Sequence, residues 1–321
     1  MTLPINHTLP GASRLVLGCM GLGGGWNNTP LTQQDEQQAF ALIEAALDCG
    51  INVFDHADIY TFGKAEAVFG RYLQAFPAQR QHLLLQSKCG IKLGNEQQPG
   101  HYDLSKTAIL AAVEQSLERL NTDYLDLLLL HRPDPLMEPD EIAAAFEQLQ
   151  QQGKVRHFGV SNMGWPQLQL LQRSLTVPLV INQLEMSLYR HHWLEESLLT
   201  GMPEGAGCHF GYGTLEYCQR EQIQLQSWGS LAQGRYFSAR ADETAAEQAT
   251  RQLVAKLAAE YQSTPEAIVL AWLLRHPARI QPVLGTSQPA RLAAAVRAEQ
   301  LNLSRIHWYQ LYIAARGGAL P

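Results

Sequence analysis

Eight short apolar runs of strand length recur along this chain and alternate with longer amphipathic segments. Alternating strands and helices predict a parallel sheet covered by helices, and eight such units in 321 residues are typical of a (β/α)8 TIM barrel. A doubly wound open sheet is the alternative that alternation alone leaves open. No linker rich in proline, glycine or serine divides the chain, so we expect a single α/β domain over residues 1–321. The predicted strands are Leu15–Met20, Ile51–Phe54, Leu83–Ser87, Leu125–Leu130, Val155–Val160, Leu179–Leu184, Ile223–Trp228 and Ile280–Leu284.

The segments between these runs carry apolar residues at the three- and four-residue spacing of a helix that packs on a sheet. In Thr107–Leu120, for example, Ile109, Val113 and Leu117 share one stripe. The glycine-rich segment Gly201–Gly213 has no periodicity and predicts a mobile loop after the sixth strand. The other predicted helices are Gln37–Leu47, Ala65–Ala75, Pro139–Gln151, Trp165–Arg173, Thr214–Glu221, Thr244–Tyr261, Pro265–Arg275 and Ala290–Glu299.

Ionisable side chains stand where three consecutive predicted strands end. Asp55 and Tyr60 follow the second strand, Lys88 follows the third, and His131 follows the fourth. In a parallel barrel these strand ends meet on one rim, where TIM-barrel enzymes carry their active sites. A tyrosine hydroxyl, with an ordinary pKa of about 10, is a poor proton donor at neutral pH. We expect Lys88 to lower that pKa and Asp55 to keep the lysine charged, while His131 orients a carbonyl or shares in proton transfer.

At these residues the chain resembles the aldo-keto reductases, in which an Asp, a Tyr, a Lys and a His in this chain order form the catalytic tetrad. The family signature Asp-x-Ala-x-x-Tyr is matched by residues 55–60. The resemblance extends from Leu15 to about Trp308 and is to the bacterial oxidoreductase branch of the family. It implies an enzyme that reduces aldehydes or ketones with NADPH, or oxidises the alcohols in reverse, with Tyr60 as the proton donor.

The same resemblance implies where a nicotinamide cofactor binds. In the family a Ser-Asn pair after the fifth strand and a Gln in the sixth hydrogen-bond the nicotinamide carboxamide, and an aromatic residue after the seventh stacks on the ring. A loop then folds over the pyrophosphate. We also expect the backbone of Met20 and Gly21, at the glycine-rich end of the first strand, to approach the cofactor. The positions that match the family pattern are Ser161, Asn162, Gln183 and Trp228, then Ser230, Leu231, Gln233 and Gly234.

The segment after the eighth strand opens a helix and predicts a phosphate site, because helix N-termini bind anions. Thr286 and Ser287 supply hydroxyls there, and Arg291 matches the arginine that contacts the 2′-phosphate of NADPH in relatives. Many relatives also have a lysine where this chain has Gly285. The resemblance therefore implies NADP(H) in preference to NAD(H), with one of the usual phosphate contacts missing.

Composition excludes several other classes of function. The net charge of −6 argues against nucleic acid and anionic membranes as partners. The five cysteines include no CxxC pair, which favours a reducing compartment. We expect no signal peptide in Met1–His7 and no membrane span, hence a cytoplasmic protein. The histidines lack metal-ligand spacing, so we predict no metal site, and no obligate protein partner is evident.

Substrate choice is expected to lie in the loops rather than in the barrel. The aromatic tail after Trp308 is predicted to pack on the barrel rather than border the pocket. Trp26 is a candidate apolar wall, and Asp58 and Glu66 are expected to be surface or supporting groups. The candidate specificity loops are Gly23–Leu31, Pro133–Pro139, Gly201–Gly213 and Gln233–Glu243.

Two other functions remain open on the same fold. One is an NADP-binding regulatory or scaffold subunit with little turnover, which the intact tetrad disfavours. The other is an aldolase that forms a Schiff base through Lys88. The aldolase would leave the predicted cofactor residues without a purpose.

Overall fold

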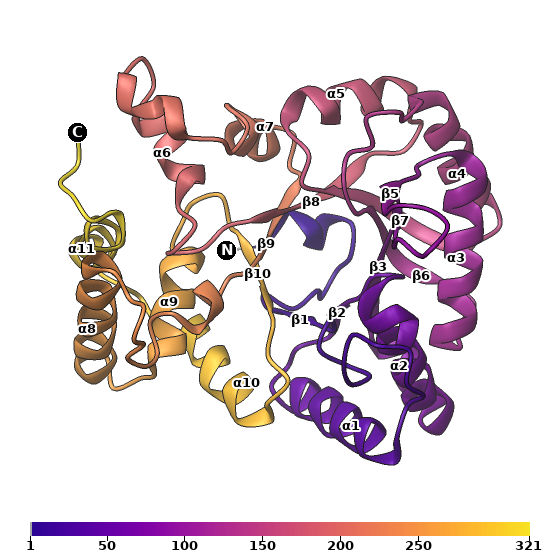
Figure 1. Ribbon diagram of the computed structural model, residues 1–321, viewed down its shortest axis with the longest axis horizontal. Coiled ribbons are helices and arrows are strands. Elements are labelled where there is room, and N and C mark those ends of the chain that lie inside the picture. Colours follow the sequence, from indigo (N-terminus) through magenta and orange to yellow (C-terminus); the bar gives the residue numbers. More distant parts are fainter. Residues whose placement is uncertain (1) are drawn as a thin grey trace.

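The computed structural model describes residues 2–321, so Met1 of the expected domain lies outside the described part. Eight parallel strands form one closed barrel, and the fold prediction is confirmed (Figure 1). The barrel strands are β1 (Val16–Gly18), β2 (Val53–Asp55), β3 (Leu84–Cys89), β6 (Leu125–Leu130), β7 (Val155–Ser161), β8 (Leu179–Glu185), β9 (Gln224–Trp228) and β10 (Gln281–Leu284). Each barrel strand pairs with the one before it in the chain, and β10 closes against β1.

Helices cover the outside of the barrel (Figure 1). Thr32, Ser105 and Thr264 begin α1, α3 and α9 by accepting a hydrogen bond from a backbone N–H three residues on. The segment 290–299, predicted as one helix, is split between α10 and the 3-10 turn Arg297–Gln300. The helices are α1 (Gln33–Asp48), α2 (Lys64–Ala75), α3 (Lys106–Leu120), α4 (Pro139–Gln151), α5 (Trp165–Ser174), α7 (Thr214–Arg220), α8 (Ala245–Glu260), α9 (Pro265–Leu274) and α10 (Pro289–Val296).

Several elements were not predicted. A two-stranded hairpin, β4 (Ile91–Lys92) with β5 (His101–Tyr102), follows β3, and a short helix α6 (His192–Leu198) follows β8. The predicted loop at 201–213 contains a 3-10 turn, Pro203–Gly207, and its mobility stays a prediction. These pieces are too short for helical periodicity to be visible in the sequence.

The aromatic tail forms a further helix, α11 (Arg305–Arg316), that packs on the outside of the barrel. Trp308 stacks on Trp272 of α9 with ring centres 5.1 Å apart. Each indole N–H also donates to the backbone carbonyl of the other tryptophan. The tail therefore packs, as expected, rather than bordering the central pocket.

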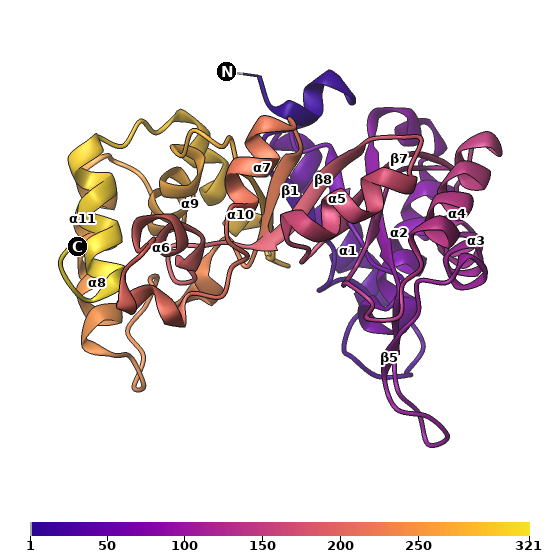
Figure 2. The same cartoon turned by 90° about the horizontal axis from the view of Figure 1, so that it is seen from above.

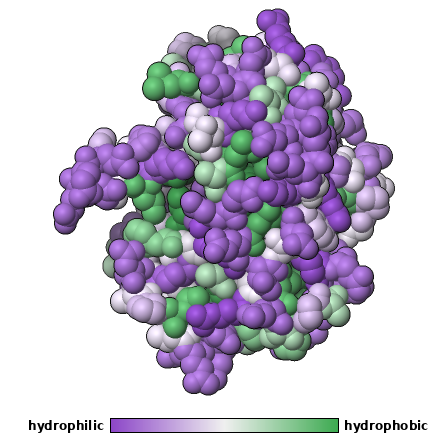
Figure 3. Space-filling view, turned by 90° about the vertical axis from the view of Figure 1, so that its right-hand side faces the viewer, coloured by the Kyte–Doolittle hydropathy of each residue, from purple (hydrophilic) through white to green (hydrophobic). Residues whose placement is uncertain are grey.

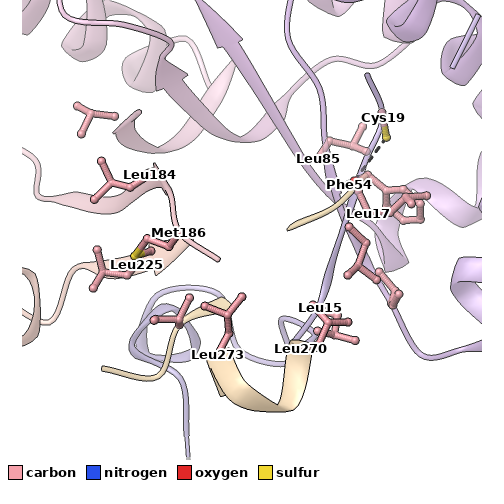
Figure 4. Close-up of a cluster of buried hydrophobic side chains, with 14 of the residues drawn as sticks. Leu15, Leu17, Cys19, Phe54, Leu85, Leu184, Met186, Leu225, Leu270 and Leu273 are labelled. Atoms are coloured by element: carbon pink, nitrogen blue, oxygen red, sulfur yellow. Dashed lines mark hydrogen bonds between the residues drawn. The ribbon is translucent and has the colours of Figure 1, made fainter. Parts of the chain in front are cut away.

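Side chains alternate between the two faces of the barrel wall. Leu17, Phe54 and Leu85 are register partners on β1, β2 and β3 and point outward into the layer between strands and helices (Figure 4). Leu270 and Leu273 of α9 belong to the same layer. Full burial of each such side chain stabilises the fold by about 1.5–3 kcal/mol.

The inside of the barrel is filled by a separate apolar cluster that includes Val16, Val53 and Val283. Leu3 and Ile5, in and beside the 3-10 turn Pro4–His7, belong to this cluster and close one end of the barrel. Figure 2 shows that segment on the opposite side of the molecule from the β4–β5 hairpin. The open end, where the strands terminate, is left for the site.

The outer face of the helical layer around α3 and α4 is mostly hydrophilic (Figure 3). This agrees with helices whose apolar stripes face the strands. Within residues 2–321, no helix combines the length and the apolar character that a membrane crossing needs.

Candidate active site

The structure brings the four predicted catalytic side chains to the carboxyl end of the barrel strands. Asp55 ends β2, Lys88 lies in β3, His131 follows β6, and Tyr60 begins a 3-10 turn after β2. The Nζ atom of Lys88 lies 2.7 Å from each carboxylate oxygen of Asp55 and 3.1 Å from the hydroxyl oxygen of Tyr60. Lys88 and Asp55 are almost completely buried. A carboxylate, an ammonium and a phenol thus form one hydrogen-bonded chain.

The turn that carries Tyr60 has an unusual backbone. Thr61 and Phe62 have φ angles of 47° and 60°, in the left-handed region that few non-glycine residues occupy. The buried hydroxyl of Thr61 donates a hydrogen bond of 2.9 Å to the backbone carbonyl of Leu22. This bond offsets part of the strain and ties the turn to the end of β1, which fixes the direction from which Tyr60 enters the site.

The expected lowering of the Tyr60 pKa is wrong for this structure. Burial raises the pKa of the phenol, and the nearby ammonium of Lys88 lowers it by less than burial raises it. The negative charge of Asp55 adds to the increase. Tyr60 therefore keeps its proton at neutral pH, as a general acid must.

Lys88 stays charged although it is buried. Burial alone acts to lower the pKa of the ammonium, but the charge and hydrogen bonds of Asp55 and Tyr60 outweigh it and the pKa is raised. The ammonium is thus available to stabilise negative charge on the phenol oxygen.

His131 is neutral. Burial lowers its pKa to about 2, and the positive charges of Lys88 and Arg132 act in the same direction. The imidazole lies edge-on to the Tyr60 ring, with ring centres 5.9 Å apart. A neutral imidazole donates or accepts a hydrogen bond but does not take up a proton near neutral pH. Of the two roles expected for His131, orienting a carbonyl fits this state better than sharing in proton transfer.

A cavity of about 630 Å³ opens above these side chains. Trp26 borders it, as expected for an apolar wall. Lys88 lies behind Tyr60 and outside the lining, and Gly21 and Ser287 are exposed beside each other at its edge. The predicted site residues that line the cavity are Met20, Asp55, Tyr60, His131, Ser161, Asn162, Gln183, Trp228, Ser230, Leu231, Gln233, Gly234, Thr286 and Arg291.

A group of amide and hydroxyl side chains forms one wall of the cavity. Asn162, with a φ of 60°, donates through Nδ2 to the hydroxyl of Ser161 at 2.8 Å. The indole N–H of Trp228 donates to Oδ1 of Asn162 at 3.0 Å. Ser161 in turn donates to the backbone carbonyl of Gln183 at 2.9 Å. The end of β7 is thereby joined to the ends of β8 and β9, and the polar atoms of this wall are held in fixed positions.

Sequence reasoning missed several residues of the site, six of which carry polar or aromatic side chains. Arg132, Phe237 and Glu266 line the cavity, and Gln86, Gln226 and Gln281 lie beneath it. Strand alternation places Gln86 and Gln226 on the same face as Lys88 and Trp228, two residues further on, but it does not show that their amides meet. Phe237 and Glu266 carry no such signal, since they reach the cavity from a loop and from the start of α9.

The two acidic residues near the signature take different places. Glu66 is completely buried rather than on the surface, and its carboxylate accepts from the hydroxyl of Ser87 at 2.6 Å and from Arg119 at 2.8 Å. It supports the outer side of β3. Asp58 is half-buried, and among residues 2–321 its buried Oδ1 has no hydrogen-bond partner. Burial raises the pKa of Asp58 to about 7, and the charge of Glu66 adds to this.

We expect Asp58→Asn to stabilise the protein above pH 7 and to lose this effect as the pH falls toward 4. The folded-state pKa of about 7 lies above the unfolded value of about 3.9, so ionisation costs stability only as the pH rises above the unfolded value. A difference of about three units corresponds to at most roughly 4 kcal/mol at high pH. Urea unfolding of the wild type and of Asp58→Asn between pH 4 and a pH above 7 measures this stability difference. Asp123→Asn, at an exposed carboxylate, is the control. If the stability difference from the wild type were independent of pH for both variants, the titration of Asp58 would be refuted.

Comparison with known proteins identifies the family to which the chain belongs. The sequence model of the Aldo/keto reductase family matches residues 14–313. Oxidoreductase YdhF of Escherichia coli K12 is 38% identical over 315 residues, covering 97% of this chain and 96% of that protein. The 6-dehydroglucose reductase of Agrobacterium fabrum is 36% identical, with 95% of each chain covered. A solved aldo-keto reductase from Klebsiella pneumoniae in complex with NADPH has a TM-score of 0.72 and 25% identity, covering 94% of this chain and 90% of that one. The chain belongs to the aldo/keto reductase family.

Proposed function

We propose that this protein is an NADP(H)-dependent reductase of aldehydes or ketones that uses Tyr60 as its general acid. The observation that carries the proposal is the buried chain from Asp55 through Lys88 to the hydroxyl of Tyr60, which ends at the cavity. Such a hydrogen-bonded chain suits the interconversion of a carbonyl compound and its alcohol, the reaction of the oxidoreductases of enzyme class 1.1.1.

The residues around the cavity fit a nicotinamide dinucleotide. Asn162 and Gln183 carry amides that match a carboxamide, and Trp228 offers a flat ring surface. Thr286 and Arg291 supply a hydroxyl and a cation for phosphate at the start of α10. NADPH bound there would supply the hydride that reduces a carbonyl carbon. The solved relative in complex with NADPH supports this assignment.

The side chains of this protein would handle the proton and the carbonyl oxygen. Neutral His131 would donate a hydrogen bond that orients the oxygen, and Tyr60 would transfer its hydroxyl proton to that oxygen as negative charge develops on it. The resulting phenolate would lie beside the Lys88 ammonium. Because the ammonium interacts more strongly with the phenolate than with the phenol, its effect belongs to the transition state rather than to the resting site.

Two relatives suggest which carbonyl compounds to test. The proteins named 6-dehydroglucose reductase are 36% and 34% identical to this chain, so a sugar aldehyde is a candidate substrate beside simple aromatic aldehydes. The test is NADPH oxidation by the wild-type protein with a panel of both kinds. Cofactor binding without turnover on any member would favour the regulatory-subunit alternative.

We expect NADPH to bind more tightly than NADH, and Arg291→Leu to remove most of this preference. A hydrogen bond to a charged group contributes about 1.5–3 kcal/mol, so the variant should bind NADPH at least about tenfold more weakly and NADH nearly unchanged. Fluorescence titration with both cofactors measures the two dissociation constants. Arg297→Leu, just beyond α10 and outside the cavity lining, is the control. Equal losses for the two cofactors would contradict a contact with the 2′-phosphate.

A further inference from the structure

The inside of the barrel at and beneath the site holds a run of glutamines, of which the proposed function uses only Gln183. Gln86, Gln183, Gln226 and Gln281 come from β3, β8, β9 and β10, and each is at most 2% exposed. An amide buried without hydrogen bonds costs about 1–3 kcal/mol, so four together require partners for most of their polar atoms. Among residues 2–321, the carbonyl oxygen of Gln86 has no hydrogen-bond partner, whereas the amide nitrogens of all four glutamines are hydrogen-bonded.

Two of these amides hold Asp55 and Gln226 together. Gln183 donates through Nε2 to Oδ1 of Asp55 at 3.2 Å and to Oε1 of Gln226 at 3.0 Å. Gln86 donates through Nε2 to the same two acceptors, at 3.0 Å for Gln226. An amide nitrogen carries two hydrogens, so both nitrogens are fully used. Oε1 of Gln226 is thus the second acceptor for each amide that contacts Asp55.

The direction of Gln226 is itself fixed from below. Its Nε2 donates to Oε1 of Gln281 at 3.0 Å, and Gln281 donates to the backbone carbonyl of Ser13 at 2.6 Å. Rotating the Gln226 amide by half a turn would place its N–H groups against the N–H groups of Gln86 and Gln183. The order of donors and acceptors therefore runs one way, from Asp55 down to the segment before β1.

This order determines what Gln183 presents to the cavity. Gln183 lines the cavity, and both of its N–H groups point to acceptors inside the barrel. Its carbonyl oxygen is the part of the amide that remains for a ligand. An acceptor in that position suits the NH2 group of a carboxamide.

We propose that Gln226 is a positioning residue that acts through two neighbours. It holds Asp55 under Lys88, by fixing the amides that bind the carboxylate, and it turns the carbonyl oxygen of Gln183 toward the cavity. The proposal rests on the proposed reductase function, since both neighbours matter only if the site binds NADP(H) and reduces a carbonyl.

The test is Gln226→Met, which keeps a similar volume but removes the acceptor and the donor. Without the acceptor, Gln86 and Gln183 each lose a partner, and the Gln183 amide is free to turn. Displacement of catalytic groups by about 1 Å can cost on the order of a hundredfold in rate. We expect turnover to fall at least about tenfold and the dissociation constant of NADPH to rise several-fold.

Gln224→Met is the matched control. Gln224 is also completely buried and lies on the same strand two residues earlier, but its Nε2 donates to the backbone carbonyls of Leu225 and Arg279 and makes no contact with Asp55. Both variants should lose thermal stability, and Gln224→Met should keep turnover and NADPH affinity within about threefold of the wild type.

Equal turnover and equal NADPH affinity in the two folded variants would overturn the positioning role. If Gln226→Met does not fold, Gln281→Met replaces it, because it removes the acceptor that orients Gln226 without touching Asp55. It should then lower turnover more than Gln224→Met, and the reverse order would refute the proposal. Wild-type protein that neither binds NADPH nor reduces a carbonyl would instead contradict the proposed function.

Discussion

Tyr60→Phe should retain NADPH affinity and lose turnover by on the order of a hundredfold or more, the scale of removing a general acid. The substitution deletes one oxygen atom that receives a hydrogen bond from Lys88 at 3.1 Å and leaves the ring in place. Because the hydroxyl keeps its proton at neutral pH, the loss should fall on the catalytic step rather than on cofactor binding. Carbonyl-dependent NADPH oxidation and a fluorescence titration measure the two quantities separately.

Tyr72→Phe is the matched control for this experiment. Tyr72 is also buried and lies in α2, away from the cavity lining. Loss of the Tyr72 hydroxyl should leave turnover within about twofold of the wild-type rate, since a change away from the site is expected to act on stability alone. Turnover by Tyr60→Phe at the wild-type rate would dismiss the phenol as proton donor, whatever the cofactor affinity.

The sequence was sufficient to predict the barrel because each strand is either almost entirely apolar or alternates between apolar and polar residues. Leu125–Leu130 is apolar at five of its six positions and was predicted to the residue. The convergence of Asp55, Lys88 and His131 was predictable from the same pattern, because parallel strands end on one rim of a barrel.

The direction of the Tyr60 pKa could not be predicted from neighbouring charges alone. The sequence shows that Lys88 and Tyr60 belong to adjacent elements, but not how much water the turn Tyr60–Gly63 excludes. Burial of the phenol raises its pKa by more than the single ammonium of Lys88 lowers it. The balance between the two depends on packing, which the sequence does not state.

The glutamines beneath Asp55 were missed for a different reason. In a strand, Gln86 and Gln226 are ordinary polar residues of an alternating pattern, and a barrel interior is expected to be apolar. The lower part of this interior is indeed apolar, with Val16, Val53 and Val283. The layer formed by Gln86, Gln183, Gln226 and Gln281 exists only because four strands bring these amides to one level. The sequence of any one strand does not show that the amides meet.

Lys88→Met should destabilise the folded protein as well as abolish most turnover. Lys88 is 1% exposed and is bonded to both oxygens of Asp55, so its removal leaves a buried carboxylate with only the amides of Gln86 and Gln183. Breaking a buried ion pair from one side typically costs about 3–5 kcal/mol. Turnover should fall by on the order of a hundredfold or more, because the phenolate loses its only adjacent cation among residues 2–321.

The double variant Asp55→Asn with Lys88→Met separates these two effects. The neutral side-chain amide that then stands at position 55 still accepts hydrogen bonds from the two glutamine amides, and no charge is left buried alone. We expect urea unfolding to show recovery of most of the lost stability, while turnover stays as low as in Lys88→Met. If restoring stability also restored turnover, the lysine would serve the fold alone, and the phenol would need another source of stabilisation. Stability that recovers without activity assigns the ammonium to the reaction, because the pair is then dispensable for folding and indispensable only where charge develops on Tyr60.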